Sequence, residues 1–417
     1  MSTQSCQIRL RSVTRILLFL LSIFIGSSAA WADIDDNLHP HHHKRLGEPD
    51  PGPPVMIGYS DGSVRLWDGF DHYIVQIKGS EWGSAVAQIV NWNNNQIVAL
   101  ANGAVEQWDG FQWKELRKGP LFLAIPDAGK GGTYAAPVNS VHLNVIEGQL
   151  VESISANYTY RDNVGVPYGG SGSEIDFWKD GNWTTAQDSA NSHGYVYVLN
   201  QPLDAIEYVI SQIIYDANTK ITYVAYGDGR IRSWNDIFTS SYQWVHSNNG
   251  WYAQITQMAI YKSNLIAALD NGAVELWNGQ GWSVPLSPTS HAVNQLAEYD
   301  GDLIIGLATG AVQEWSGYSW TELHNDGWSA PVTQLTLYNG KLIVGLGKYG
   351  AVEQYDGVFN WTELHGNSWG SPVTQITSNG SLIVGLANGS VEQWDGNQWI
   401  ELQGSLGTNA VTQLIVR

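Results

Sequence analysis

The sequence has almost no cysteine, and it has little positive charge. Its only cysteine, Cys6, lies in the first segment, so the rest of the chain offers no disulfide, no thiolate nucleophile and no cysteine ligand for a metal. Lysine and arginine number 20 against 39 acidic residues, and the formal net charge is −19. This balance argues against nucleic acid and anionic membrane surfaces as partners.

Long apolar runs are also scarce, and the single clear one lies near the start. Ile16 to Gly26 follows Arg9, Arg11 and Arg15 and precedes the small-residue sequence Ala30-Trp31-Ala32. This order is typical of a secretory signal, which we place at residues 1–32, with an uncleaved anchor as the alternative. The run is short for a membrane span. We therefore expect an exported protein, periplasmic or secreted, without stable membrane insertion.

A histidine- and proline-rich segment, residues 33–54, follows the signal. Clustered imidazoles can bind copper, nickel or zinc weakly, and the candidate ligands are His39, His41, His42 and His43. The alternative is a flexible tail that binds no metal. We expect no cofactor in the rest of the chain, because no metalloprotease helix motif, P-loop or nucleophile elbow is present.

The remainder, residues 55–417, repeats one unit. The stretch NGSVEQWDGNQWIEL (Asn388 to Leu402) has a near copy, NGAVEQWDGFQWKEL (Asn102 to Leu116). The glycine that precedes each apolar–polar–aromatic strand recurs eight times, mostly about 40 residues apart, which is the length of a four-stranded propeller blade. These glycines are Gly62, Gly103, Gly172, Gly229, Gly272, Gly310, Gly350 and Gly389.

Each unit contains four short β-branched and aromatic runs separated by turns. In the most regular copy they are PVTQLTLY, KLIVGL, AVEQY and NWTEL, and none is long enough for a helix. Asn-Gly and Asp-Gly pairs, such as Asn339-Gly340 and Asp61-Gly62, suit type I′ hairpin turns. We therefore predict an all-β domain, a single eight-bladed propeller of four-stranded antiparallel blades, with seven blades as the alternative.

Aromatic residues and the chain ends support this register. Tryptophan recurs on the third strand and again on the fourth, where its ring would fill the wedge between blades. The first unit begins at Val55 without a first strand, and the chain ends with Ala410 to Arg417, a first strand with nothing after it. We expect the C-terminal strand to complete the N-terminal blade and so remove the open edges.

The segment DGSVRLWDG (Asp61 to Gly69) resembles the third strand of WD-repeat propellers, and related bacterial propellers fit as well. The resemblance covers about Val55 to Arg417, although the Gly-His dipeptide of true WD repeats is missing. It implies a rigid interaction platform and leaves the function open.

Two repeated polar positions look functional but have structural explanations. A glutamine recurs on the innermost strand of seven blades, and we interpret it as a partner for the neighbouring blade's backbone, with a ligand-binding ring as the alternative. Glu106, Glu275, Glu353 and Glu392 follow the valine of strand three. Because equivalent copies have similar environments, they make a poor acid–base pair. We expect them on solvated strand faces.

Three insertions interrupt the repeat around the third blade, at Arg117–Ala136, Tyr158–Gly172 and Gln187–Ala205. Strand order would place these loops on one face of the ring, and aromatic residues with a few polar groups are typical of binding surfaces. The candidate ligand-binding residues are Tyr134, Tyr158, Tyr160, Arg161, Asp162, Tyr168, His193, Tyr195 and Tyr197.

A second candidate set lies in short connections between blades. Trp82, Trp251, Trp328 and Trp369 could stack on sugars, as in propeller lectins, or plug the seams. We predict a monomeric, non-enzymatic binding module for a protein or polysaccharide ligand, acting through the loops near blade three. The alternative is a multivalent lectin that uses the tryptophans. An enzyme with a loop site that no motif reveals is less favoured.

Overall fold

A computed structural model describes residues 53–69, 74–126, 133–161, 167–188, 209–239, 241–246, 253–283 and 290–417. The chain divides into two compact units. The first comprises Met1–Asp50 with Gly110–Gln112, and only Gly110–Gln112 is described, as a hairpin turn. The second, Pro51–Asp109 with Trp113–Arg417, carries all of the sheets. The signal and residues 33–52 of the histidine-rich segment therefore lie outside the described residues and remain predictions.

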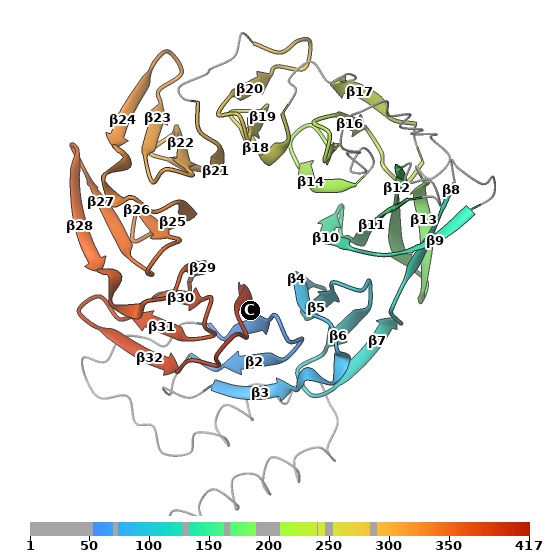
Figure 1. The fold of residues 1–417 in the computed structure, drawn as a ribbon, viewed down its shortest axis with the longest axis horizontal. Coiled ribbons are helices and arrows are strands. Elements are labelled where there is room, and N and C mark those ends of the chain that lie inside the picture. The colour runs from blue at the N-terminus through green and yellow to red at the C-terminus, as the bar shows by residue number, and fades with distance from the viewer. Residues whose placement is uncertain are drawn as a thin grey trace, which may run out of the picture. The chain divides into compact units, whose positions relative to one another are not determined.

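The second unit is an eight-bladed propeller, as predicted. Seven blades have four antiparallel strands. Blade five has three strands and one further bridge, between Trp277 and Trp282. In every blade the strands follow one another in sequence order from the centre outward, except where the ring closes (Figure 1). Eight sheets exclude the seven-bladed alternative. In the described part of the chain, no helix has both the length and the apolar character that a membrane crossing requires.

The inner half of each blade consists of its first two strands. The first strands, one per blade, are β33 (Val411–Val416), β4 (Val86–Trp92), β10 (Ser140–Ile146), β14 (Ile210–Asp216), β18 (Ile255–Tyr261), β21 (Val293–Tyr299), β25 (Val332–Tyr338) and β29 (Val373–Ser378). The second strands are β1 (Val55–Tyr59), β5 (Asn95–Leu100), β11 (Gln149–Arg161), β15 (Ile221–Tyr226), β19 (Asn264–Leu269), β22 (Asp302–Leu307), β26 (Lys341–Leu346) and β30 (Leu382–Leu386). Consecutive first strands contact one another around the whole ring.

The outer half carries the third and fourth strands. The third strands are β2 (Val64–Trp67), β6 (Val105–Trp108), β12 (Pro167–Lys179), β16 (Ile231–Trp234), β20 (Val274–Trp277), β23 (Val312–Trp315), β27 (Val352–Gly357) and β31 (Val391–Trp394). The fourth strands are β3 (Ile74–Lys78), β7 (Trp113–Arg117), β13 (Asn182–Asp188), β17 (Gln243–His246), β24 (Trp320–His324), β28 (Asn360–His365) and β32 (Trp399–Gln403). A separate hairpin, β8 (Phe122–Pro126) and β9 (Thr133–Pro137), connects blades two and three.

The ring closes where the sequence predicted. β33 pairs antiparallel with β1, from Val55 opposite Val416 to Tyr59 opposite Val411. The amide of Arg417 donates to the carbonyl of Pro54 at 2.8 Å, and the amide of Ser60 donates to Ala410 at 2.9 Å. The last strand of the chain is thus the innermost strand of the first blade, and no blade is left with an unpaired central edge.

Strand-four tryptophans join adjacent blades with a recurrent hydrogen bond. In five seams the indole N–H donates to a carbonyl on the fourth strand of the preceding blade, at 2.7 to 3.1 Å. The pairs are Trp113 to Ile77, Trp183 to Leu116, Trp282 to Val245, Trp361 to Leu323 and Trp399 to Leu364. The same rings pack against strand-three aromatics, for example Trp394 against Trp399 at 5.3 Å between centroids. The predicted wedge-filling role is confirmed.

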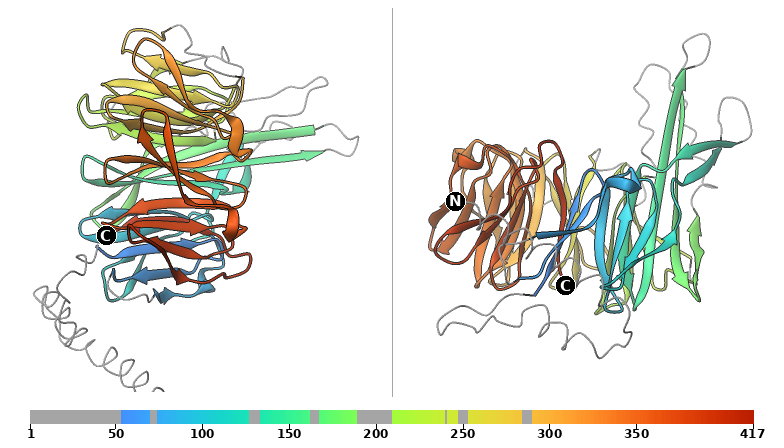
Figure 2. Two further views of the ribbon diagram at one scale, coloured as in Figure 1. Left: turned by 90° about the vertical axis from the view of Figure 1, so that its left-hand side faces the viewer. Right: turned by 90° about the horizontal axis from the view of Figure 1, so that it is seen from below.

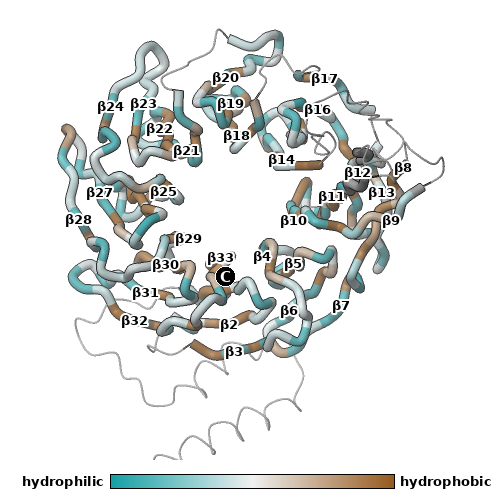
Figure 3. Tube along the Cα trace, in the orientation of Figure 1, coloured by the Kyte–Doolittle hydropathy of each residue, from teal (hydrophilic) through white to brown (hydrophobic). Residues whose placement is uncertain are grey.

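The innermost glutamines act as clamps between blades, as interpreted from the sequence. Gln88 accepts from the amide of Leu143 at 2.8 Å and donates to the carbonyl of the same residue at 2.9 Å. Gln212 makes the same pair of bonds with Met258 between blades four and five. At these two seams the glutamine side chain thus satisfies a backbone N–H and C=O of the next blade's first strand, which no other strand of the described chain pairs with on that side. Figure 3 shows hydrophobic and polar stretches interspersed around the ring. Second strands such as β1, β5 and β26 are buried at nearly every position, because both of their faces are covered.

Two physical constraints require glycine at the position that defines the repeat, namely a positive φ angle and a close backbone contact. Gly310 has a φ of +100°, and a Cβ there would lie 2.5 Å from the carbonyl oxygen of Ala330 in the next connection. The preceding Asp or Asn does not form the predicted type I′ turn, because only the glycine has positive φ. Instead its side chain accepts a hydrogen bond from the residue two positions on, as Asn388 does from Ser390 at 3.0 Å. The type I′ prediction holds at Asn339-Gly340, where both φ angles are positive.

Deleting Ala410–Arg417 tests the closure. The deletion removes β33, exposes the edge of β1 and breaks the contacts of β33 with β29 and β4. We expect the single thermal unfolding transition to be lost or lowered by at least ten degrees, since a ring opened at one point unfolds from that point. Calorimetry of the wild-type and truncated chains measures this, and an unchanged single transition would show that the closing strand is dispensable.

Candidate binding surface around blade three

Blade three departs from the other blades by the length of its central hairpin. β11 and β12 each have 13 residues, whereas the second strands of the other blades have five or six. Their pairing continues without a register shift as far as Arg161 opposite Pro167. The right-hand view of Figure 2 shows this hairpin rising well above the other blades, on the same side as β8 and β9. We call the segment Ala156–Arg161 with Pro167–Gly172 the ribbon.

The ribbon corrects the prediction of an irregular loop at Tyr158–Gly172. Most of that insertion is regular antiparallel structure, and the glycines at 169, 170 and 172 belong to β12. Register places Tyr158, Tyr160 and Tyr168 on one face, because Tyr160 is opposite Tyr168 and strand positions alternate between faces. The sequence analysis took Gly172 as the glycine that precedes a third strand, but Gly172 lies within β12 and pairs with Ala156.

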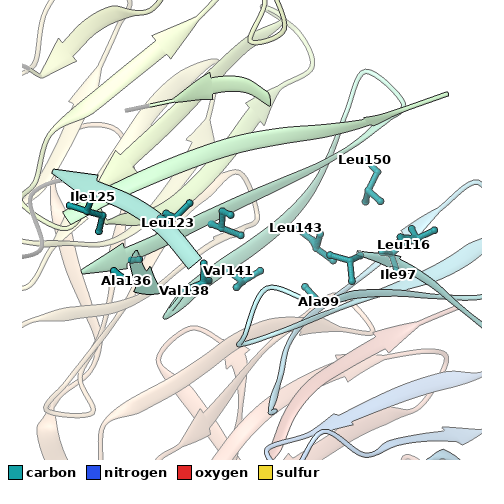
Figure 4. Packing of buried hydrophobic residues seen from close by; sticks show 13 residues of the cluster. Ile97, Ala99, Leu116, Leu123, Ile125, Ala136, Val138, Val141, Leu143 and Leu150 are labelled. Atoms are coloured by element: carbon teal, nitrogen blue, oxygen red, sulfur yellow. The ribbon is translucent and has the colours of Figure 1, made fainter. Parts of the chain in front are cut away.

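The hairpin of β8 and β9 packs across the base of the ribbon. This is a second correction, since Arg117–Ala136 was expected as a plain loop. Leu123, Ile125 and Ala136, labelled in Figure 4, are buried in one hydrophobic cluster with Ile154 and Ala156 of β11. The opposite face of the hairpin is open: Phe122 is 58% exposed. The ribbon therefore stands on a packed two-layer base.

Only part of the predicted ligand set can be placed. Tyr134 lies on β9 and is 45% exposed. Tyr158, Tyr160 and Arg161 lie on β11 and Tyr168 on β12, where the structure describes the backbone. The remaining predicted residues lie outside the described residues, and they are Asp162, His193, Tyr195, Tyr197 and the metal candidates His39, His41, His42 and His43. Among described residues, no group of three or more His, Asp or Glu could hold a metal ion.

A buried ionic cluster joins blade two to the two strands from which the ribbon extends, and sequence reasoning missed it. Arg117 of β7 binds Glu152 of β11 at 2.6 Å and Asp176 of β12 at 2.5 Å. Both carboxylate side chains are almost fully buried, at 0% and 1% exposure. Burial raises the pKa of Glu152 to about 7, although the guanidinium of Arg117 opposes this shift. Because removing one partner would strand a buried charge, the cluster fixes β11 and β12 against their neighbour.

The inter-blade tryptophans occupy equivalent turns at the seams. Trp82, Trp328 and Trp369 end three-residue 3-10 turns, η2 (Ser80–Trp82), η3 (Asp326–Trp328) and η4 (Asn367–Trp369). Each ring is half-buried and meets a strand-four tryptophan edge-on, with centroids 4.9 or 5.0 Å apart. In two seams a histidine also covers one ring face, as His365 does for Trp369 at 3.5 Å. Trp251 lies outside the described residues.

Solved structures share this architecture at low sequence identity. No known protein-family model matches the sequence, and no curated protein is similar to it. The computationally designed Ika8 protein is 20% identical, with 79% of this chain and 89% of that one covered and a TM-score of 0.55. The C-terminal WD40 domain of Sif2 is 13% identical, with 81% and 91% covered and a TM-score of 0.55. BamB from Moraxella catarrhalis is 13% identical, with 85% and 94% covered and a TM-score of 0.52.

The fold is a WD-repeat-like β-propeller. At these identities the likeness shows the fold alone.

The propeller buries the strand-three glutamates, which corrects the prediction of solvated faces. Glu106, Glu275, Glu353 and Glu392 are only 5% to 7% exposed. Both faces of a blade are covered by neighbouring blades, so a polar residue that alternates with a buried valine still points into a seam. Burial, followed by the facing Glu363, raises the pKa of Glu353 to about 7, and burial with Glu401 does the same for Glu392.

These carboxyl groups predict that the propeller is more stable in mild acid. Their folded pKa lies above the unfolded value, so their contribution is fully present below about pH 4.5 and is lost as the pH rises through about 7. The melting temperature should therefore fall by several degrees between about pH 5 and pH 8. The double variant Glu353→Gln, Glu392→Gln should flatten this slope, whereas Glu298→Gln, at an exposed position, should leave it unchanged. An identical slope in the double variant would contradict the assignment.

Proposed function

We propose that this propeller is an exported, monomeric binding module that recognises a protein partner through the ribbon and the β8–β9 hairpin. The observation that carries the proposal is the position of the tyrosines. Three of them share one register face of a strand pair that extends beyond every other blade. Tyrosine provides a large contact area with few rotamers to restrict, which suits recognition on a rigid support.

The support for this surface is unusually firm. Arg117 bridges blade two to β11 and β12 in the part of blade three from which the ribbon extends, and the β8–β9 hairpin covers one face of the ribbon's base. A partner would therefore meet a surface that needs little rearrangement, and the ordering cost of binding would be small. Tyr134, which pairs with Ile125 and so lies on the hairpin face turned toward β11, is 45% exposed and adds a fourth aromatic residue near the ribbon, whereas Phe122 is exposed on the opposite face.

The seam tryptophans give the lectin alternative weaker support. Repetition at three equivalent turns is what several sugar sites would need. However, Trp328 and Trp369 each already stack on a histidine and pack against a strand-four tryptophan. These contacts leave less ring surface for a sugar, and they also explain the residues as seam plugs.

Replacing Tyr158, Tyr160 and Tyr168 with serine tests the proposal. Binding of a partner recovered by cross-linking to the wild-type mature chain should weaken at least tenfold, or about 1.4 kcal/mol, with melting unchanged. Tyr318→Ser is the matched control, since Tyr318 is 93% exposed on a distant turn of blade six, and it should bind normally. If the triple variant binds normally while Trp328→Ala and Trp369→Ala abolish binding, the lectin alternative replaces the proposal.

A further inference from the structure

The outer edge of β11 loses its neighbour where the ribbon begins. The last backbone bond of the β10–β11 ladder runs from the amide of Asn139 to the carbonyl of Ser155, at 2.9 Å. The preceding residue, Val138, already donates to Leu121 instead, at 3.0 Å. The chain that leads into β10 has therefore turned away from β11 at this level. One side-chain contact, Asn139 to Asn157, closes the covered part of the edge.

The alternation of backbone direction along a strand then determines which N–H and C=O groups point out from the uncovered edge of β11. The carbonyl of Ser155 points toward β10, and in an antiparallel strand every second residue directs both backbone groups to the same side. Asn157, Thr159 and Arg161 therefore direct their N–H and C=O groups away from β12. In the described chain, no backbone hydrogen bond reaches these groups from another strand.

The opposite edge of the ribbon is protected, which makes the two edges unequal. β12 begins at Pro167, which has no N–H to donate, and proline is a usual guard of strand edges. β11 has no proline in its outward series. Its edge offers three donors and three acceptors over five residues, or roughly 17 Å of strand.

We propose that a partner polypeptide binds by adding an extended segment as a strand along Asn157–Arg161, on the outer edge of β11. This inference rests on the proposed function and specifies how the partner is held. Backbone hydrogen bonds supply the docking, and the partner's alternate side chains lie on the register face of Tyr158 and Tyr160. That face favours apolar or aromatic residues at every second position. The partner residues between them lie on the face of Thr159 and Arg161, where an acidic residue would complement the charge of Arg161.

A phage-displayed library of random linear 12-residue peptides, selected on the mature wild-type chain, provides the probe. The best peptide is synthesised and its affinity measured by titration calorimetry. The proposal expects selected peptides to alternate apolar and polar residues. On binding, amide exchange at Asn157, Thr159 and Arg161 should slow at least tenfold. A selection that yields no peptide at this edge, or a peptide that leaves these amides unprotected, would overturn it.

Two variants at one position separate strand addition from side-chain recognition. Thr159→Pro replaces an outward N–H with the ring Cδ and should weaken the peptide at least tenfold, whereas Thr159→Ala keeps that N–H and should bind within twofold of wild type. Slow exchange at Tyr158 and Tyr160, which pair with Gly170 and Tyr168, verifies that the ribbon persists in the proline variant. If Thr159→Pro binds normally while the tyrosine-to-serine variant does not, strand addition fails and the proposed function stands. If both variants bind normally, both fail.

Discussion

The interaction on which the propeller depends is the hydrogen bond from a strand-four indole to the fourth strand of the preceding blade. It recurs at five described seams, and in each the donor ring also fills the wedge between two sheets. A buried indole N–H needs a partner, so the bond fixes both the spacing and the rotation of neighbouring blades. Glutamine clamps at the centre and pairing of β33 with β1 complete the constraint.

A ring built in this way leaves no blade face for solvent or for a ligand. The strand-three glutamates are buried for this reason, and Arg117 meets Glu152 and Asp176 inside a seam rather than on the surface. A partner must then be recognised by segments that are added to the repeated four-stranded blade. In the described chain the largest excess is the ribbon with its β8–β9 base, and it is coupled to blade two through the buried ionic cluster.

Most of the fold could be predicted from the sequence because the same turn and aromatic residues recur at the same positions in each repeat. The tryptophan at 399 and its equivalents, the glycine at 389 and the unpaired strand at each end were enough for the blade count and the closure. The ribbon was missed because Gly172 aligned with the glycines that precede a third strand, whereas its pairing with Ala156 of β11 shows that β12 begins earlier. The burial of Glu392 and the Arg117 cluster depend on contacts between blades, which no single-strand pattern contains.

The central claim is that these seams make all eight blades one cooperative unit from which the ribbon projects. Native-state hydrogen exchange of residues 33–417, measured without any partner, tests this claim most directly. The account predicts that the first strands of every blade, β10 and β14 included, exchange with the same opening free energy, equal to that of global unfolding. Outward amides of the ribbon should exchange orders of magnitude faster. Opening of β10 or β14 at a clearly lower free energy than β25 or β29 would contradict a single closed ring.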